Sequence, residues 1–222
     1  MRYIGVAGQA QFGKDTLADR LQLKLSDKSW KRSALASAVK KVYCETFNVD
    51  LDFVEKWKTN PQIPLGFDMN VRQSLQFIGD GFRKIQPNIW LDLAFRERNV
   101  IFSDIRYANE FRRVKKEGGL NILVARPDKL NDDMNESESQ IRPYIEHLLN
   151  YWNIYCSDSK YCAKILVEED FHHISSLAKE NGTKVPKDIE MFDIFVCNCG
   201  NVDELYKTVD EYITPFCDSY LF

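Results

Sequence analysis

Apolar runs alternate with amphipathic segments along most of the chain. The first run, RYIGVA at 2–7, ends in a glycine-containing turn, and Leu17, Leu21 and Leu25 then follow at the spacing of one helical face. Helical spacing returns in three later segments: at 36–47, in VRQSLQFIGDGFRKI, and in NIWLDLAFRER after Pro87. The pattern therefore predicts a strand, a turn and a series of helices in the first half of the chain.

A β-α-β unit is predicted in the middle of the chain. NVIFSD (99–104) and LNILVARP (120–127) are apolar runs of strand length. The charged segment between them carries Tyr107, Phe111 and Val114 on one helical face, and a pair of glycines marks its end. Because strands and helices alternate, we expect an α/β fold in which helices cover both faces of an open, mostly parallel sheet.

The pattern weakens toward the C-terminus before a last predicted strand, FDIFVCN at 192–198, and a helix that begins around Val202. The acidic stretch at 128–139 is typical of a loop or flap, and residues 140–185 have helical spacing without a recognisable motif. We therefore expect one domain over residues 1–222, with a lid or helical insertion at about 128–190.

Composition narrows the class of protein. The 222 residues are 44% hydrophobic and 28% charged, which is typical of a globular domain, and a net charge of -3 gives no support for binding nucleic acid. A leader peptide and a membrane-spanning run are both absent, so a cytoplasmic protein without a membrane partner is expected, or one in the host cytoplasm if the chain is viral. Zinc-site spacing is also absent among the cysteines, which we interpret as free thiols: Cys44, Cys156, Cys162, Cys197, Cys199 and Cys217.

The turn after the first strand, GQAQFGKDT, nearly matches the phosphate-binding pattern G-x-x-x-x-G-K-[ST]. In such a loop, backbone N–H groups and the positive end of the next helix surround phosphate oxygens, and the lysine adds a mobile charge. A glycine-containing turn without this function is the alternative, but the strand before the loop and the helix after it favour the phosphate site. The residues predicted to bind ATP are Gly8, Phe12, Gly13, Lys14, Asp15 and Thr16.

Asp15 stands where switch-type nucleoside triphosphatases carry a hydroxyl that binds magnesium directly. A carboxylate beside a triphosphate is repulsive unless a cation or an arginine lies between them. Asp15 is therefore expected either to reach magnesium, through water, or to face the substrate side. Thr16 is left to contact a donor phosphate, which favours a small-molecule kinase over a switch protein.

Three motifs of the chain resemble the deoxynucleoside monophosphate kinases of bacteriophages. They are G-K-D-T-x-A-D from Gly13 to Asp19, R-x-x-L-Q-x-x-G-x-x-x-R followed by a tryptophan from Arg72 to Trp90, and DIRYANE, which a glycine pair and Arg126-Pro127 complete. FDIFVCNCGNVDEL is a fainter match. The resemblance covers about two-thirds of the chain, and it implies a three-layer P-loop kinase fold that uses ATP and Mg²⁺.

The resemblance and the charge requirements of phosphoryl transfer together select the remaining site residues. Two polyanions must be held together, so Arg72, Arg83 and Arg106 are predicted to bind the acceptor phosphate and, with Lys14, to act in catalysis. Taken singly, each arginine is better explained by a surface salt bridge, but three arginines that match the family pattern beside a phosphate loop favour phosphate binding.

The other predicted substrate contacts each have a structural alternative. Asp104 is expected near magnesium, through water, or at a helix N-terminus, and Glu110 at the acceptor or as a helix cap. Gln76 is predicted to read a base edge and Trp90 to stack on a base, unless either packs in the core. Gly79 completes the predicted set.

The expected activity is ATP-dependent phosphoryl transfer to deoxynucleoside 5'-monophosphates, which gives diphosphates. A related kinase for phosphomevalonate or dephospho-coenzyme A is one alternative, and a nucleotide-binding regulator without turnover is another. The expected partners are small nucleotides, and the chain is expected to be a monomer or a homodimer. The sequence does not indicate the preferred base or sugar.

Overall fold

The computed structural model describes residues 2–62, 69–130, 139–155, 164–167, 174–176, 178–182 and 184–221. The chain forms two compact units. The first consists of Met1–Ser33 and Arg98–Phe222, and the second of Ala34–Glu97. This second unit was not predicted from the sequence. The expected lid at about 128–190 and the expected single domain stay predictions.

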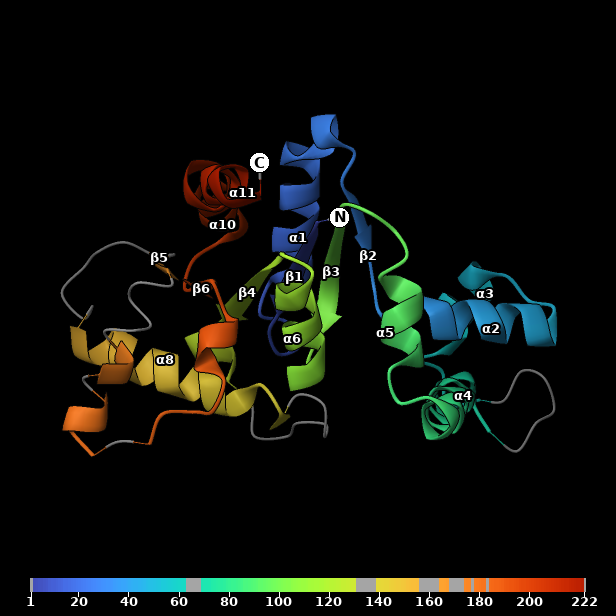
Figure 1. Ribbon diagram of the computed structural model, residues 1–222. Coiled ribbons are helices and arrows are strands. Elements are labelled where there is room, and N and C mark those ends of the chain that lie inside the picture. Colours follow the sequence, from blue (N-terminus) through green and yellow to red (C-terminus); the bar gives the residue numbers. More distant parts are fainter. Residues whose placement is uncertain are drawn as a thin grey trace. The chain divides into compact units, whose positions relative to one another are not determined.

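The first unit is built on a sheet. Its strands are β1 (Tyr3–Ala7), β2 (Lys31–Ser33), β3 (Val100–Ile105), β4 (Leu120–Ala125), β5 (Lys164–Val167) and β6 (Ile194–Cys197). Within the described residues they form a six-stranded sheet in the order β2-β3-β1-β4-β6-β5, in which β5 alone is antiparallel to its neighbour (Figure 1). The sheet is therefore mostly parallel, as expected.

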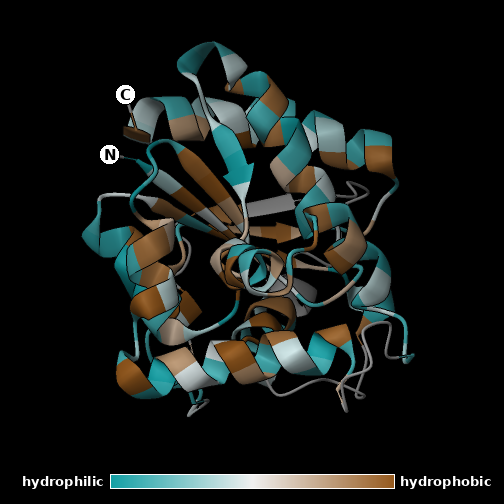
Figure 2. Ribbon diagram, turned by 90° about the vertical axis from the view of Figure 1, so that its right-hand side faces the viewer, coloured by the Kyte–Doolittle hydropathy of each residue, from teal (hydrophilic) through white to brown (hydrophobic). Residues whose placement is uncertain are grey.

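The central strands are apolar because both of their faces are covered. Every residue of β1, β4 and β6 is buried, and Figure 2 shows brown, apolar stretches among the strands of the sheet. Helix α1 (Lys14–Lys24) packs on β1 and β3 and contacts α10 (Val202–Thr208), whereas α6 (Ala108–Lys116) and α8 (Arg142–Tyr155) pack on β4. The two sets lie on opposite faces (Figure 1), as right-handed crossovers to either side of β1 require.

The short elements of the first unit connect these layers. The 3-10 turns are η1 (Ser26–Lys28), η2 (Pro127–Lys129) and η3 (Ile189–Met191). After α10 the chain continues through a π-helical turn, η4 (Val209–Ile213), into α11 (Thr214–Leu221). Arg20 of α1 binds Asp210 of η4 through two N–H groups, so this C-terminal helical segment is also held to α1 by an ion pair.

The second unit is helical, with α2 (Ser37–Phe47), α3 (Leu51–Trp57), α4 (Val71–Ile85) and α5 (Ile89–Ala94). Its core is formed by Tyr43, Val54 and Val71. Helix α4 begins with a capping box, in which the Asn70 side chain accepts from the Gln73 N–H and the Gln73 side chain accepts from the Asn70 N–H. The amphipathic spacing in the sequence therefore predicted α4 correctly.

The structure confirms each predicted strand and the predicted helices, and it corrects one segment. Residues 140–185 were expected to be helical. Within the described part of this range, α8 and residues 174–176 and 178–180 are helical as expected, whereas Lys164–Val167 forms the edge strand β5. Most of the acidic stretch, at 131–138, lies outside the described residues, as do Cys156 and Cys162. The described cysteines are free thiols. Among the helices that the structure describes, none has the length and hydropathy needed to span a bilayer.

Candidate phosphate-binding site

The loop from Gly8 to Gly13 joins the C-terminal end of β1 to α1. Strand β1 lies between β3 and β4, and the chain leaves β1 and β3 through helices on opposite faces. In an open α/β sheet, ligands bind outside the carboxyl ends of the strands at such a switch point. The loop therefore occupies the place in the fold where a ligand site is expected.

Two glycines allow the loop to adopt this path. Gly13 has a φ of 90°, and a Cβ there would lie 2.6 Å from the Asn198 Nδ2. A Cβ on Gly8 would lie 2.8 Å from the backbone oxygen of Val124 on β4. Both positions consequently need glycine, the first for its left-handed conformation and both for the close approach of the loop to the strands beside it.

Asn198 directly follows β6 and supports the loop by a hydrogen bond to its backbone. The sequence did not identify it as a site residue. Its buried side-chain amide donates to the Phe12 carbonyl at 3.0 Å, and its backbone N–H donates to the Ala125 carbonyl at 2.7 Å. Asn198 belongs to the faintest of the family-like motifs, together with Gly200, where a Cβ would meet the Glu204 carboxylate at 1.9 Å. The motif therefore supports the loop and need not contact a ligand.

The first turn of α1 is suited to an anion. Gly13 occupies the N-cap position with no side-chain cap from the described residues, so the first N–H groups of the helix can donate to an external oxygen. The Lys14 ammonium lies at this end of the helix, 3.1 Å from the Asp15 carboxylate. Backbone donors and a cation thus converge where phosphate was predicted to bind.

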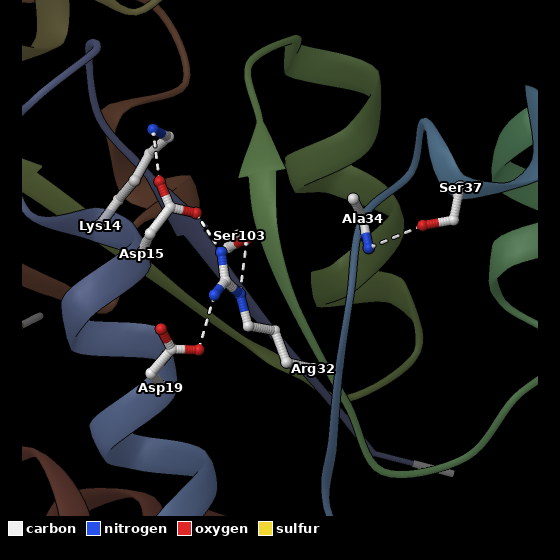
Figure 3. Close-up of polar contacts among 7 residues, drawn as sticks. All are labelled: Lys14, Asp15, Asp19, Arg32, Ala34, Ser37 and Ser103. Carbon is white, nitrogen blue, oxygen red and sulfur yellow. Dashed lines mark hydrogen bonds and ion pairs between the residues drawn. The ribbon is translucent and has the colours of Figure 1, made fainter. Parts of the chain in front are cut away.

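Asp15 is part of a charged cluster (Figure 3). Its carboxylate accepts from Lys14 and from an Nη of Arg32, while the other Nη of Arg32 donates to Asp19 at 2.6 Å and its Nε to the Ser103 hydroxyl at 3.1 Å. Partial burial raises the pKa of Asp15, but the charges of Lys14 and Arg32 and hydrogen bonds from Lys14 and Ser103 outweigh it, so the pKa is lowered overall. Asp15 is therefore ionised at neutral pH.

The carboxylate and hydroxyl oxygens near the loop suit a magnesium ion that is bound through water. Magnesium in kinases usually keeps several waters and takes one or two carboxylates together with substrate phosphates. Asp15 presents a carboxylate and Thr16 a hydroxyl in the first turn of α1, and Asp104 lies half-buried near the end of the neighbouring strand β3. Because both Asp15 oxygens already accept charged hydrogen bonds, direct coordination by Asp15 does not fit this arrangement.

The segment after β3 bears on the capping roles that were predicted as alternatives for Glu110 and Asp104. The Glu110 carboxylate accepts from the backbone N–H groups of Arg106 and Tyr107, at 2.8 and 3.0 Å, so Glu110 caps α6. Tyr107 occupies the N-cap position of α6, and the structure therefore does not assign this position to Asp104.

The second unit carries the other predicted substrate contacts. Arg72, Gln76 and Arg83 are exposed on α4, and their spacing places them with Gly79 on one helical face. Arg72 and Arg83 are three helical turns apart, however, which is about 16 Å along the axis. The two backbone positions are therefore farther apart than a phosphate is wide, and the binding of one phosphate by both long side chains stays a prediction.

Trp90 is buried against α4 in the second unit. Its side chain is buried, its indole N–H donates to the Gly79 carbonyl at 2.9 Å, and its ring lies 5.5 Å from that of Phe82. These contacts hold α5 against α4. The structure therefore favours the packing alternative for Trp90 over stacking on a base.

Comparison with known proteins gives one distant relative. The chain is 27% identical over 165 residues to the "Putative deoxynucleotide monophosphate kinase" of Acanthamoeba polyphaga mimivirus, in a match that covers 64% of this chain and 83% of that protein. No family model matches the chain. The chain is thus a distant homologue of the mimivirus protein, and its mostly parallel sheet flanked by helices is consistent with a P-loop kinase fold.

Proposed function

We propose that this protein transfers the γ-phosphoryl group of ATP to deoxynucleoside 5'-monophosphates. The observation that carries the proposal is the N-terminus of α1, which no side chain of the described residues caps, directly after the left-handed Gly13 and beside the Lys14 ammonium. This arrangement provides backbone donors and a cation for the phosphates of a nucleotide. The name of the mimivirus relative supports a deoxynucleotide as the acceptor.

The proposed reaction needs positioning and charge neutralisation more than proton transfer. An oxygen of the acceptor phosphate forms a bond to the γ-phosphorus while the bond to the β–γ bridging oxygen breaks, and ADP leaves with that electron pair. The attacking oxygen is already anionic, so a general base is not required. Lys14 neutralises charge on the transferring group. Magnesium, when bound through water near Asp15 and Asp104, adds further neutralisation.

The acceptor contacts are assigned to α4 of the second unit. The spacing of Arg72 and Arg83 suits a nucleotide bound along the helix, with one arginine at its phosphate and the other toward its nucleoside end. Gln76 lies between them on the same exposed face and can hydrogen-bond a base edge. The ion pair of Arg83 with Asp80, at 3.0 Å, is exposed and therefore restrains Arg83 only weakly.

Replacing Arg72 or Arg83 by lysine is expected to raise the KM for the acceptor about tenfold, or about 1.4 kcal/mol, because the planar fork is lost although the charge is kept. The KM for ATP should change little. The double variant should show about a hundredfold increase, since contacts this far apart add independently. Steady-state kinetics with each substrate varied provide the test. Asp80→Asn is the control, because it breaks the ion pair and leaves the arginine: a similar rise in this variant would contradict the assignment.

Replacing Gly13 by alanine is expected to destabilise the protein by about 1–3 kcal/mol and to weaken ADP binding. The substitution puts a residue with a Cβ into the strained left-handed conformation of Gly13. The new Cβ also displaces the Asn198 amide from the Phe12 carbonyl. Urea denaturation and ADP titration measure the two effects. Gly81→Ala is the matched control, because a Cβ there meets no described atom within 4 Å, and alanine favours the helix. Unchanged ADP binding by the folded Gly13 variant would remove the loop from the nucleotide site.

The proposed activity is tested by measuring ADP formation from ATP with a panel of acceptors. Turnover with deoxynucleoside monophosphates is the expected result. Turnover with phosphomevalonate or dephospho-coenzyme A alone would assign the chain to a different acceptor. Nucleotide binding without turnover on any acceptor would support a regulator.

A further inference from the structure

Arg32 binds two carboxylates of the helix that follows the phosphate loop. Asp15 and Asp19 are one turn apart on α1, so both face the same side of the helix. Strand β2 pairs with β3, with Arg32 opposite Ile101, and it also contacts α1. This pairing places the Arg32 guanidinium between the two carboxylates, as Figure 3 shows, and within 3.1 Å of the Ser103 hydroxyl on β3.

Each of the three nitrogens of the Arg32 guanidinium donates a hydrogen bond. Nε donates to Ser103, and the two Nη atoms donate to Asp19 and Asp15. Three contacts from two elements fix the plane of Arg32, whereas an isolated exposed ion pair would leave it mobile. The Arg32 side chain is 30% exposed, compared with 53% for Asp15 and 59% for Asp19, so the cation is the most shielded of the three.

The charges of this cluster bear on nucleotide binding. Lys14 and Arg32 carry two positive charges, and Asp15 and Asp19 two negative charges, so the cluster is neutral as a whole. Asp15 lies in the first turn of α1, beside the N–H groups proposed to bind phosphate. Without Arg32, the Asp15 carboxylate would repel a polyphosphate and would have only Lys14 as its cation in the cluster.

We infer that Arg32 is a positioning residue for the nucleotide: it neutralises Asp15 and holds that carboxylate in the cluster, so that Lys14 remains available to the phosphates. This inference rests on the proposed function, because it assumes that the loop binds a nucleotide. It goes further in explaining how a phosphate loop tolerates an aspartate after its lysine. Arg32 itself need not touch the ligand.

The test is ADP binding measured by calorimetry with EDTA present, so that metal coordination does not contribute. Arg32→Met is expected to raise the Kd for ADP about tenfold, because the unbalanced charge of Asp15 repels the phosphates. Adding Asp15→Asn to this variant should restore the Kd to within about threefold of the wild type, since the repelling charge is then removed. Arg32→Lys, which keeps the charge, should lose less affinity than Arg32→Met.

Asp19→Asn is the matched control for the rescue. Asp19 binds the same guanidinium one turn farther from the loop, so the Arg32→Met/Asp19→Asn protein should bind ADP as weakly as Arg32→Met alone. Circular dichroism establishes folding. If Arg32→Met does not fold, Arg32→Gln replaces it, because the amide keeps hydrogen bonding without the charge.

The outcomes separate this inference from the proposed function. Failure of the wild-type protein to bind ADP would overturn the proposed function and, with it, the inference. If the wild type binds and Arg32→Met binds equally well, Arg32 has no role in nucleotide binding. Suppose that Arg32→Met binds ADP weakly. If Asp15→Asn fails to restore binding, or if Asp19→Asn restores it as well as Asp15→Asn does, Arg32 acts through general stability and the charge-balance inference is wrong.

Discussion

Replacing Lys14 by methionine is expected to lower kcat about 100- to 1,000-fold and to leave the fold intact. The ammonium lies at the N-terminus of α1, where the proposed site holds the β- and γ-phosphates. In the loose transition state of phosphoryl transfer, negative charge develops on the β–γ bridging oxygen as ADP leaves, so a cation placed there contributes more to the rate than to ground-state binding. Methionine has a similar length, and it removes the charge together with the N–H donors.

The effect of Lys14→Met should appear mainly in kcat, with a smaller change in the Kd for ADP. Lys24→Met is a suitable control, since Lys24 belongs to the same helix but binds Asp210 at 2.8 Å, far from the loop in sequence. Loss of that partly exposed ion pair should cost less than about 1 kcal/mol and leave kcat unchanged. A folded Lys14→Met protein with near-normal kcat would exclude the loop from the chemistry.

The elements with strong periodicity were predictable, and the short edge elements were not. Helix α4 and the buried strands β1, β4 and β6 carry clear patterns because each buries one helical face or two strand faces. Strand β2 has only three residues, Lys31–Ser33, and none of them is apolar. Its position depends on pairing with β3, which hydrophobic spacing does not encode. Strand β5 was missed for a different reason, because the run at 165–167 is apolar but too short to distinguish a strand from the helical spacing expected over 140–185.

The residues of the candidate site likewise divide into those that the sequence predicted and those that only the fold brings together. The loop and Lys14 are contiguous in sequence, and the strand and helix around them made the motif recognisable. Arg32 and Asn198 reach the loop from other strands, so only the fold brings them there. A carboxylate directly after the lysine requires an arginine or another cation beside it, but the chain has many arginines and the sequence does not indicate Arg32. On α4, the helical spacing places Arg72 and Arg83 on one face, and their binding of one acceptor phosphate stays a prediction.

Asp193 is a buried charged residue at which a single conservative substitution is expected to cost much stability. It is fully buried just before β6, where its carboxylate accepts from the Lys115 ammonium and from the Asn121 N–H at 2.7 Å. Asn121 at the start of β4 in turn donates its side-chain amide to the Phe111 and Met191 carbonyls, at 3.0 and 2.9 Å. These contacts fix the beginning of the β4–β6 pair, at whose other end Asn198 holds the phosphate loop.

Asp193→Asn is expected to lower the free energy of unfolding by about 3–4 kcal/mol, because it removes the counter-charge of Lys115 and replaces an acceptor by an amide that cannot satisfy both donors. For a chain of this size the change corresponds to a fall in Tm on the order of 10 °C. Urea denaturation should show a lower midpoint with an unchanged slope, since the surface exposed on unfolding is the same. Asp188→Asn is the matched control: Asp188 binds Arg112, whose side chain is 52% exposed, so its loss should cost less than about 1 kcal/mol. Equal destabilisation by the two changes would mean that burial of Asp193 does not strengthen its contacts, and that the β4–β6 pair does not depend on this carboxylate.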